Sequence, residues 1–87
     1  MKISVIIVNY KVPDYLHQAI LSIEKATKDY ETEIFVVDNN SEDGSVEYLT
    51  KLHPQAIFIQ NNENIGFSKA NNIAAKRAKG QYILFIN

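Results

Sequence analysis

Four short apolar runs punctuate the chain, and each is rich in isoleucine, valine, phenylalanine or tyrosine. They cover residues 3–9, 33–38, 56–60 and 82–87. Three of them are nearly continuous rather than alternating, which is typical of strands that are covered on both faces, as in a parallel sheet. The pattern therefore predicts four parallel β-strands.

The first two intervals between these runs carry helical spacing. Pro13 suits the first position of a helix, because its missing N–H would have no partner there anyway. The apolar face that follows at 3.6-residue spacing consists of Leu16, Ala19, Ile20 and Ile23. In the second interval we expect a short helix, capped by Ser41 or Asp43. Its inward side chains are predicted to be Val46 and Leu49.

A third helix is predicted to begin near Gly66. Its inward-facing residues are expected to be Phe67, Ala70, Ala74 and Ala78. Three cations lie near its negative end, where they suit the helix dipole: Lys76, Arg77 and Lys79. Gly80 is expected to end the helix as a left-handed cap.

The resulting order, β-α-β-α-β-α-β, has a simple solution in three dimensions. Parallel strands joined by right-handed helical crossovers form a doubly wound sheet between two helical layers, most simply in the strand order 3-2-1-4. We therefore predict an α/β, three-layer, Rossmann-like fold. Ligands of such sheets bind beyond the carboxyl ends of the strands, where the strand order reverses.

Polar residues stand at the carboxyl end of every predicted strand. The first strand ends in Asn9 and Tyr10, the second in residues 38–41, the third in residues 60–66, and the fourth in Asn87. Asparagine, aspartate, serine and glycine are also ordinary turn and cap residues, so any one of these ends alone is explained by a turn. All four on the same rim favour a ligand crevice.

Several sharper motifs are absent. The segment after Asp38 fails the calcium-loop spacing, the first strand is followed by no glycine-rich dinucleotide fingerprint, and there is no Walker loop. His17 and His53 are expected to be surface or capping histidines rather than catalysts. There is no cysteine, which excludes disulfides and thiolate metal sites. A metal held by the remaining oxygen ligands would be Mg²⁺ or Mn²⁺.

The length of the chain, its net charge and its first residues argue against several further classes of function. The chain has 87 residues, enough for one domain, and a net charge of −1, which gives no basic field for nucleic acid. The first ten residues have neither the length of a membrane-spanning helix nor the small-residue cleavage site of a signal peptide, so a strand is the better interpretation. A receiver-like signalling module would need acidic residues after the first strand, where Asn9 and Tyr10 stand.

Three motifs together resemble one known family. They are "SVIIVNY", "EIFVVDNNSEDGS" and "NENIGFSKANNIAAKRAKGQYILFIN", and they are distributed from residue 4 to residue 87. In this order and spacing they are similar to the N-terminal, donor-nucleotide-binding half of the family-two glycosyltransferases of GT-A fold. The resemblance implies that residues 1–87 are this half of the domain. It also implies a UDP-sugar or dTDP-sugar donor, transferred to an acceptor with inversion in most members.

The resemblance also assigns candidate binding residues. Asn9 and Tyr10 match the turn that lies against the base, and Asp38 and Asn39 match the pair that recognises the pyrimidine. Either member of that pair can accept the imide N–H, and the other can cap the turn. Capping the second helix is the alternative role for Asp38, and packing over Pro13 is the alternative for Tyr10.

The remaining candidates match the family's N-x-G…N element: Asn64, Gly66 and Asn72. Gly66 is expected to let the backbone turn or approach the ligand closely. For Asn64 and Asn72 a structural role is as good an interpretation as direct contact. The general base and the acceptor-binding half of the family find no match in the chain, so no catalytic residue is assigned here.

The end of the sequence departs from the family pattern. Asn87 matches the first position of a D-x-D-like metal motif, and the sequence stops there. The resemblance implies Mg²⁺ or Mn²⁺ for the full-length enzyme, so we expect an inactive fragment. The fourth strand would be an unpaired edge, which predicts self-association. A module that completes another chain's sheet is the alternative function. The resemblance further implies a cytoplasmic location, peripheral at the inner face of a membrane.

Overall fold

The computed structural model describes residues 2–86 and confirms the predicted α/β architecture. The elements in chain order are β1 (Lys2–Asn9), α1 (Pro13–Ala26), β2 (Glu31–Asp38), α2 (Ser45–Leu52), β3 (Ile57–Gln60), α3 (Phe67–Arg77) and β4 (Tyr82–Ile86). The strands form one sheet in the order β3-β2-β1-β4, and every pairing is parallel. The strand order predicted from the sequence is therefore correct.

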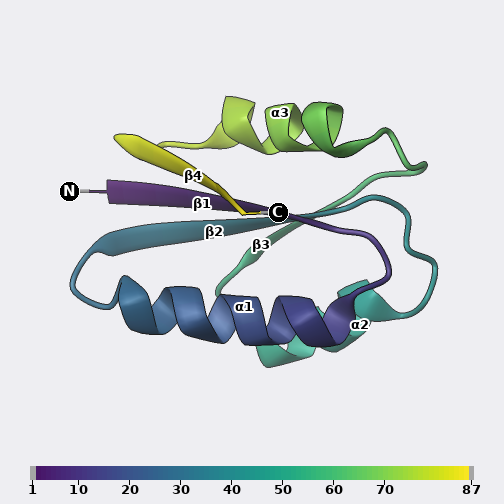
Figure 1. The fold of residues 1–87 in the computed structure, drawn as a ribbon, viewed down its shortest axis with the longest axis horizontal. Coiled ribbons are helices and arrows are strands. Elements are labelled where there is room, and N and C mark those ends of the chain that lie inside the picture. The colour runs from purple at the N-terminus through teal and green to yellow at the C-terminus, as the bar shows by residue number, and fades with distance from the viewer. Residues whose placement is uncertain (1, 87) are drawn as a thin grey trace.

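The sheet lies between two helical layers. Figure 1 shows α3 on one face of the sheet and α1 and α2 on the other. β1 occupies the centre and pairs along all eight of its residues with β2. Strand order reverses beside β1, because β2 and β3 follow on one side and β4 returns on the other.

The nearly continuous apolar runs supply two cores because successive strand residues point to opposite faces. One core lies under α1 and α2 and consists of Val5, Ile7, Leu16, Ile20, Ile34, Val36 and Leu49. The other lies under α3 and consists of Ile6, Val8, Phe35, Val37, Ala70 and Ala74. Small alanines on α3 let this helix lie close to the sheet. Within residues 2–86, no helix combines the length and apolar character needed to cross a bilayer.

Two details of the predicted α3 are wrong. Phe67 is 58% exposed rather than inward-facing, whereas Ala70 and Ala74 are fully buried as predicted. Phe67 is the first helical residue, and the sheet contact of α3 is made one turn later. Gly80 is not a left-handed cap, because α3 ends at Arg77 and its C-cap, Ala78, is extended.

Gly80 is needed for space instead. A Cβ atom at this position would lie 2.6 Å from both the backbone nitrogen and the hydroxyl oxygen of Ser4. The Gly80 amide donates a hydrogen bond of 2.8 Å to that hydroxyl. The chain leaving α3 therefore presses directly on β1, and this contact starts β4 at the correct register.

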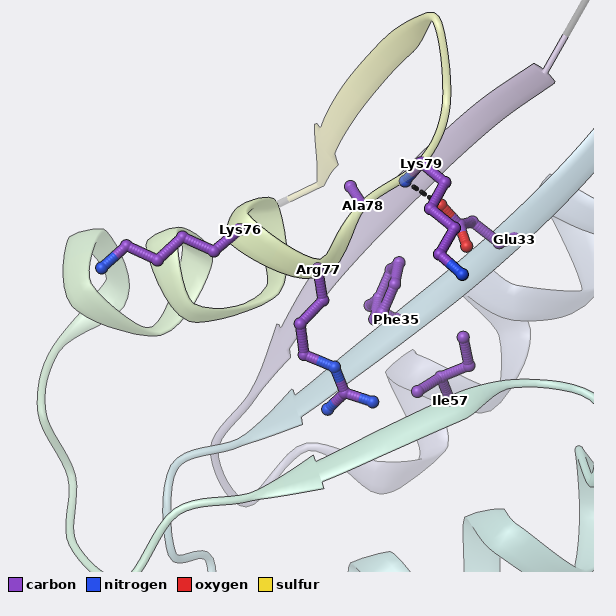
Figure 2. A pocket seen from close by; sticks show the side chains of 7 residues that line it. All are labelled: Glu33, Phe35, Ile57, Lys76, Arg77, Ala78 and Lys79. Atoms are coloured by element: carbon purple, nitrogen blue, oxygen red, sulfur yellow. Dashed lines mark hydrogen bonds between the residues drawn. The ribbon is translucent and has the colours of Figure 1, made fainter.

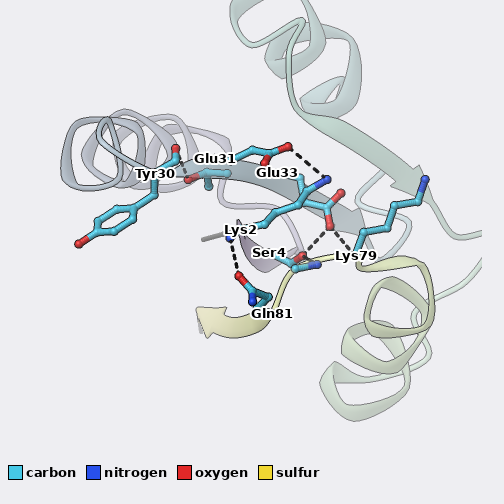
Figure 3. A network of polar contacts seen from close by, with 9 residues as sticks. Lys2, Ser4, Tyr30, Glu31, Glu33, Lys79 and Gln81 are labelled. Atoms are coloured by element: carbon cyan, nitrogen blue, oxygen red, sulfur yellow. Dashed lines mark hydrogen bonds and ion pairs between the residues drawn. The ribbon is translucent and has the colours of Figure 1, made fainter.

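A polar network at the amino end of the sheet fixes the same connection (Figure 3). The Glu33 carboxylate accepts hydrogen bonds from the Ser4 hydroxyl at 2.5 Å and from the Lys79 amide at 2.6 Å. Burial acts to raise the pKa of Glu33, but these two hydrogen bonds and the nearby lysines outweigh it, so the pKa is lowered. Glu33 is therefore a charged acceptor that joins β1, β2 and the start of β4.

The expected caps of α2 are also revised. Its N-cap is Gly44, in a left-handed conformation with φ of 79°. Asp43 precedes the N-cap rather than being it, although its carboxylate accepts the amide of Ser45, the first helical residue, at 3.0 Å. Ser41 does not cap the helix, because its side chain contacts Asp38 instead. His53, expected at the surface or as a cap, is the C-cap of α2 but is buried.

We expect Gly80→Ala to destabilise the chain. The added methyl group meets backbone rather than a flexible side chain, and overpacking of this kind costs about 1–3 kcal/mol. The urea midpoint of unfolding should fall, while Lys76→Ala, at an exposed position on α3, should leave it nearly unchanged. Equal midpoints for Gly80→Ala and the unaltered chain would show that β1 and residue 80 are not in close contact.

Candidate functional site

The carboxyl ends of the three strands β1, β2 and β3 meet at one rim. Asn9 is paired with Asp38 in the register of β1 and β2, and Asp38 is paired with Gln60 in the register of β2 and β3. The backbone continues these ladders, because the Asn39 amide donates to the Asn9 carbonyl at 2.9 Å. The polar residues that follow these strands in sequence are therefore neighbours in space.

Asp38 is the centre of a buried hydrogen-bond network. Its side chain is 2% exposed. Oδ1 accepts the Asn9 side-chain amide and the Ser41 hydroxyl, both at 2.7 Å, and Oδ2 accepts the Ser41 backbone amide at 3.0 Å. These charge-assisted bonds compensate for the burial of the carboxylate. They also leave Oδ2 with capacity for another donor.

The loop after β1 is tied to the same network. The Lys11 amide donates to the Ser41 hydroxyl at 2.8 Å, and the Val12 amide donates to Asn9 Oδ1 at 3.3 Å. Tyr10 stands at the turn of this loop with 39% of its surface exposed. The ammonium group of Lys11 lies 5.2 Å from the centroid of the Tyr10 ring. Tyr10 therefore presents an accessible aromatic face beside the rim.

Asn39 connects the end of β2 to the loop that leads into α3. It is as buried as Asp38. Its amide nitrogen donates to the Gly66 carbonyl at 3.2 Å, and its amide oxygen accepts the side-chain amide of Asn61 at 3.0 Å. Both ends of the Asn39 side chain are thus engaged inside the protein, which makes it a brace for the loop.

The glycine of the N-x-G element is explained by its backbone conformation. Gly66 has φ of 82° and ψ of 167°, a region that is essentially restricted to glycine. Its amide donates to Asn64 Oδ1 at 2.9 Å, which closes a local turn. A Cβ at Gly66 would meet no atom within 4 Å, so backbone conformation rather than crowding requires glycine. This supports the predicted turning role.

Asn72 differs from the other candidates. It is exposed on α3, and no hydrogen bond among residues 2–86 joins its side chain to the strand ends. The structure therefore brings together Asn9, Tyr10, Asp38, Asn39, Asn64 and Gly66 at the rim, without a contact from Asn72.

Sequence reasoning missed two residues of the network. Ser41 was expected as a helix cap, but it bridges Asp38 and the Lys11 amide. Asn61 was part of a polar run with no assigned role, and it contacts Asn39. Ser41 lies three residues after Asp38, a spacing at which a carboxylate commonly accepts a turn amide, so the sequence did contain a local signal for it.

The described residues contain no group of three or more His, Asp or Glu side chains able to hold a metal ion. Asn87, the candidate first position of a metal motif, lies outside the described residues. Residues 2–86 therefore supply no metal site on their own.

A separate groove of about 480 Å³ lies at the other end of the sheet (Figure 2). It is lined by Glu33, Phe35, Ile57, Lys76, Arg77, Ala78 and Lys79. The guanidinium group of Arg77 lies over the Phe35 ring, 5.9 Å from its centroid. Phe35 and Ile57 form the first pair of the β2–β3 ladder, so this groove is distinct from the rim of strand ends.

Two bacterial glycosyltransferases are similar to this chain along almost its whole length. An uncharacterized glycosyltransferase of Bacillus subtilis, YfnE, is 36% identical over 98% of the chain, which corresponds to 22% of that protein. A poly(ribitol-phosphate) beta-glucosyltransferase of Bacillus spizizenii is 36% identical over 100% of the chain and 14% of that protein. The chain thus spans less than a quarter of the length of these two relatives.

Solved structures share the fold. The crystal structure of Staphylococcus aureus TarS 1-349 in complex with UDP-GlcNAc superposes with a TM-score of 0.78, at 30% identity, over 99% of this chain and 26% of that one. The mannosyltransferase PcManGT from Pyrobaculum calidifontis, in complex with GDP-Man and Mn²⁺, gives a TM-score of 0.75 at 27% identity, over 93% of this chain and 25% of that one.

The family assignment agrees with the geometry. The sequence profile of Glycosyl transferase family 2 matches residues 4–87, from the first strand to the end of the chain. The four-stranded sheet in the order 3-2-1-4 corresponds to the GT-A fold of TarS. This chain is a member of glycosyltransferase family 2, with the GT-A fold.

Proposed function

We propose that residues 1–87 form the donor-nucleotide-binding half of a glycosyltransferase domain and bind a UDP-sugar or dTDP-sugar at the rim of strand ends. The observation that carries this proposal is the buried Asp38 network at that rim, in which one carboxylate oxygen keeps spare acceptor capacity. The structures of TarS with UDP and with UDP-GlcNAc support a uridine nucleotide as the ligand.

Asp38 is the better of the two candidates for recognising the pyrimidine. A carboxylate can accept about four hydrogen bonds, and three to Asp38 are already described. The imide N–H of uracil or thymine would supply the fourth. The Asn39 amide oxygen accepts one described bond, from Asn61, but it is uncharged and therefore a weaker acceptor than the Asp38 carboxylate, so we assign Asn39 to positioning the loop.

Tyr10 is the proposed platform for the base. Its ring is exposed next to Asn9, and aromatic side chains stack on nucleic-acid bases with about 1–3 kcal/mol per base. Asn64 and Gly66 would shape the loop on the far side of the crevice. Asn72, being exposed on α3, is proposed to contact the ligand rather than the protein.

We propose that turnover uses groups beyond residues 2–86. We propose that the full-length protein transfers the sugar to an acceptor with inversion and uses Mg²⁺ or Mn²⁺, as the Mn²⁺ in the PcManGT structure suggests. Such a cation would neutralise the leaving diphosphate. No group of three or more metal-binding side chains is found in residues 2–86, and we propose that the chain by itself binds the donor without transferring the sugar.

The proposal for the sugar acceptor is based only on the names of related proteins. Matched proteins include a poly(ribitol-phosphate) transferase and the beta-1,3-glucosyltransferase WfaP of Escherichia coli, which is named for a diphosphoundecaprenol acceptor. We propose that the full-length protein builds a cell-surface polymer from the cytoplasmic side, peripheral to the inner face of the membrane.

β4 offers a second proposal, self-association through the sheet edge. Four apolar residues of this strand are more than a third exposed: Tyr82, Ile83, Leu84 and Phe85. β4 pairs only with β1 among the described strands, so its other edge carries unpaired backbone groups. Such an edge is a template for another chain, either a second copy or a chain whose sheet it completes.

The nucleotide site can be tested by calorimetry with UDP and dTDP in the presence of Mn²⁺. We expect weak binding, and Tyr10→Ala should weaken it about tenfold because the stacking surface is lost. Tyr30→Ala, an exposed tyrosine before β2 and thus at the opposite end of the sheet, is the matched control and should bind normally. Asp38→Asn should reduce binding to UDP more than Tyr30→Ala does. Absence of heat at millimolar UDP would refute the site.

The edge proposal predicts a dimer or larger species by light scattering at high protein concentration. Leu84→Lys should shift the chain to monomer, because a lysine on an edge strand opposes pairing. Leu21→Lys on α1 is the matched control, since Leu21 is 44% exposed and Leu84 is 47% exposed. A clean monomer for the unaltered chain argues against a second copy, and co-purification with a complementary C-terminal half then favours the sheet-completing alternative.

A further inference from the structure

The two histidines of this chain meet across a helix interface. His17 lies in the second turn of α1, and His53 is the C-cap of α2, at the entry to the connection that leads into β3. His17 Nδ1 and His53 Nε2 are 2.8 Å apart, with the rings tilted by 45°. His53 is 2% exposed, so water cannot replace this partner at little cost.

Only one of the two facing ring nitrogens, His17 Nδ1 or His53 Nε2, can carry a proton while the hydrogen bond is intact. At 2.8 Å, one ring nitrogen donates and the other accepts, so the accepting nitrogen must be unprotonated. If both imidazoles are cationic, each facing nitrogen carries a hydrogen, and the hydrogen bond is replaced by repulsion between two charges, one of them on the buried His53. The second proton can therefore bind only if the contact opens.

The groups around His53 favour its protonated, cationic form only in part. The Glu24 carboxylate, also on α1, has Oε1 at 4.0 Å from His53 Nδ1. The other Glu24 oxygen is occupied by the side-chain amide of Gln55. Glu24 and His17 are the titratable groups with an electrostatic effect on His53, and both come from α1. One carboxylate can balance one imidazolium and not two.

We propose that the His17–His53 hydrogen bond is a pH-sensitive clamp, which holds α1 against the end of α2 at neutral pH and opens when both rings become protonated. The clamp joins the helices that follow β1 and β2, two of the three strands whose ends form the rim. Opening it would loosen this helical layer while the sheet ladders remain intact.

The direction of the pH dependence follows from His53. Burial lowers the pKa of His53 from its ordinary 6.5, Glu24 opposes this shift, and His17 adds to it. The unfolded chain therefore binds a proton more readily than the folded chain. The stabilisation is fully present above about pH 6.5 and is lost as the pH falls below that value.

The composition of the chain allows the pH dependence of its stability to be attributed to these two histidines. The chain has two histidines and no cysteine, so His17 and His53 are the only side chains that ordinarily titrate near pH 6. Urea unfolding of the 87-residue chain at pH 7.5 and pH 5.5 is the experiment. The unfolding constant should rise at the lower pH, by at most about tenfold per pH unit for each proton taken up.

Two substitutions remove titration while preserving the geometry. Asparagine reproduces a donor or acceptor near Nδ1 and glutamine one near Nε2, so His17→Asn combined with His53→Gln should retain a contact and lose most of the change between pH 5.5 and 7.5. Gln18→His adds an exposed histidine to α1 and is the control, which should behave as the unaltered chain.

The outcomes separate clearly. The proposal is overturned if the double variant keeps the full pH dependence, or if the unaltered chain shows none. If the double variant does not fold at pH 7.5, an NMR titration of the unaltered chain decides: a His53 that titrates below 6.5 together with loss of the α1–α2 contact supports the clamp. A His53 that titrates at 6.5 or above, or an undisturbed contact at pH 5.5, contradicts it.

Discussion

The burial of the Asp38 carboxylate constrains the ends of β1 and β2 and the loops that follow them. Asp38 ends the central pair of strands almost without exposure to water, and a charge in that place must be met by donors. Asn9 supplies one from the neighbouring strand, and Ser41 supplies two from the following turn. Because the β1–β2 register places Asn9 directly opposite Asp38, the sheet ladder and the polar network each require the other.

The loops around this carboxylate carry backbone conformations that are costly for ordinary residues. Lys11, Asn40 and Glu42 all have positive φ, between 56° and 63°, and they are the only non-glycine residues of 2–86 that do. They flank the ends of β1 and β2. Such conformations persist where surrounding bonds over-determine them, and the bonds from the Lys11 and Ser41 amides serve that purpose. A strained, well-fixed rim is a common property of binding sites.

The two ends of the sheet are built on different principles. At the amino end, Glu33, Ser4 and Lys79 form hydrogen bonds that secure the return of the chain from α3 to β4. At the carboxyl end, hydrogen bonds fix loops whose outer surfaces remain open, with Tyr10 exposed. The first arrangement secures the topology of the sheet, and the second leaves an open surface at the strand ends.

The sequence by itself determined the element order, the parallel sheet in the order 3-2-1-4 and the meeting of polar strand ends, because these follow from periodicity, short connections and the handedness of crossovers. It also indicated the family, through three motifs distributed from residue 4 to residue 87. It could not determine partners that are far apart in sequence: the Lys11 amide donating to the Ser41 hydroxyl, Gly80 pressing on Ser4, and His53 buried against His17. Local patterns record which residue types suit a turn or a helix. Which atoms lie within 3 Å of one another depends on how segments 30 to 80 positions apart pack together, and only the tertiary structure decides that.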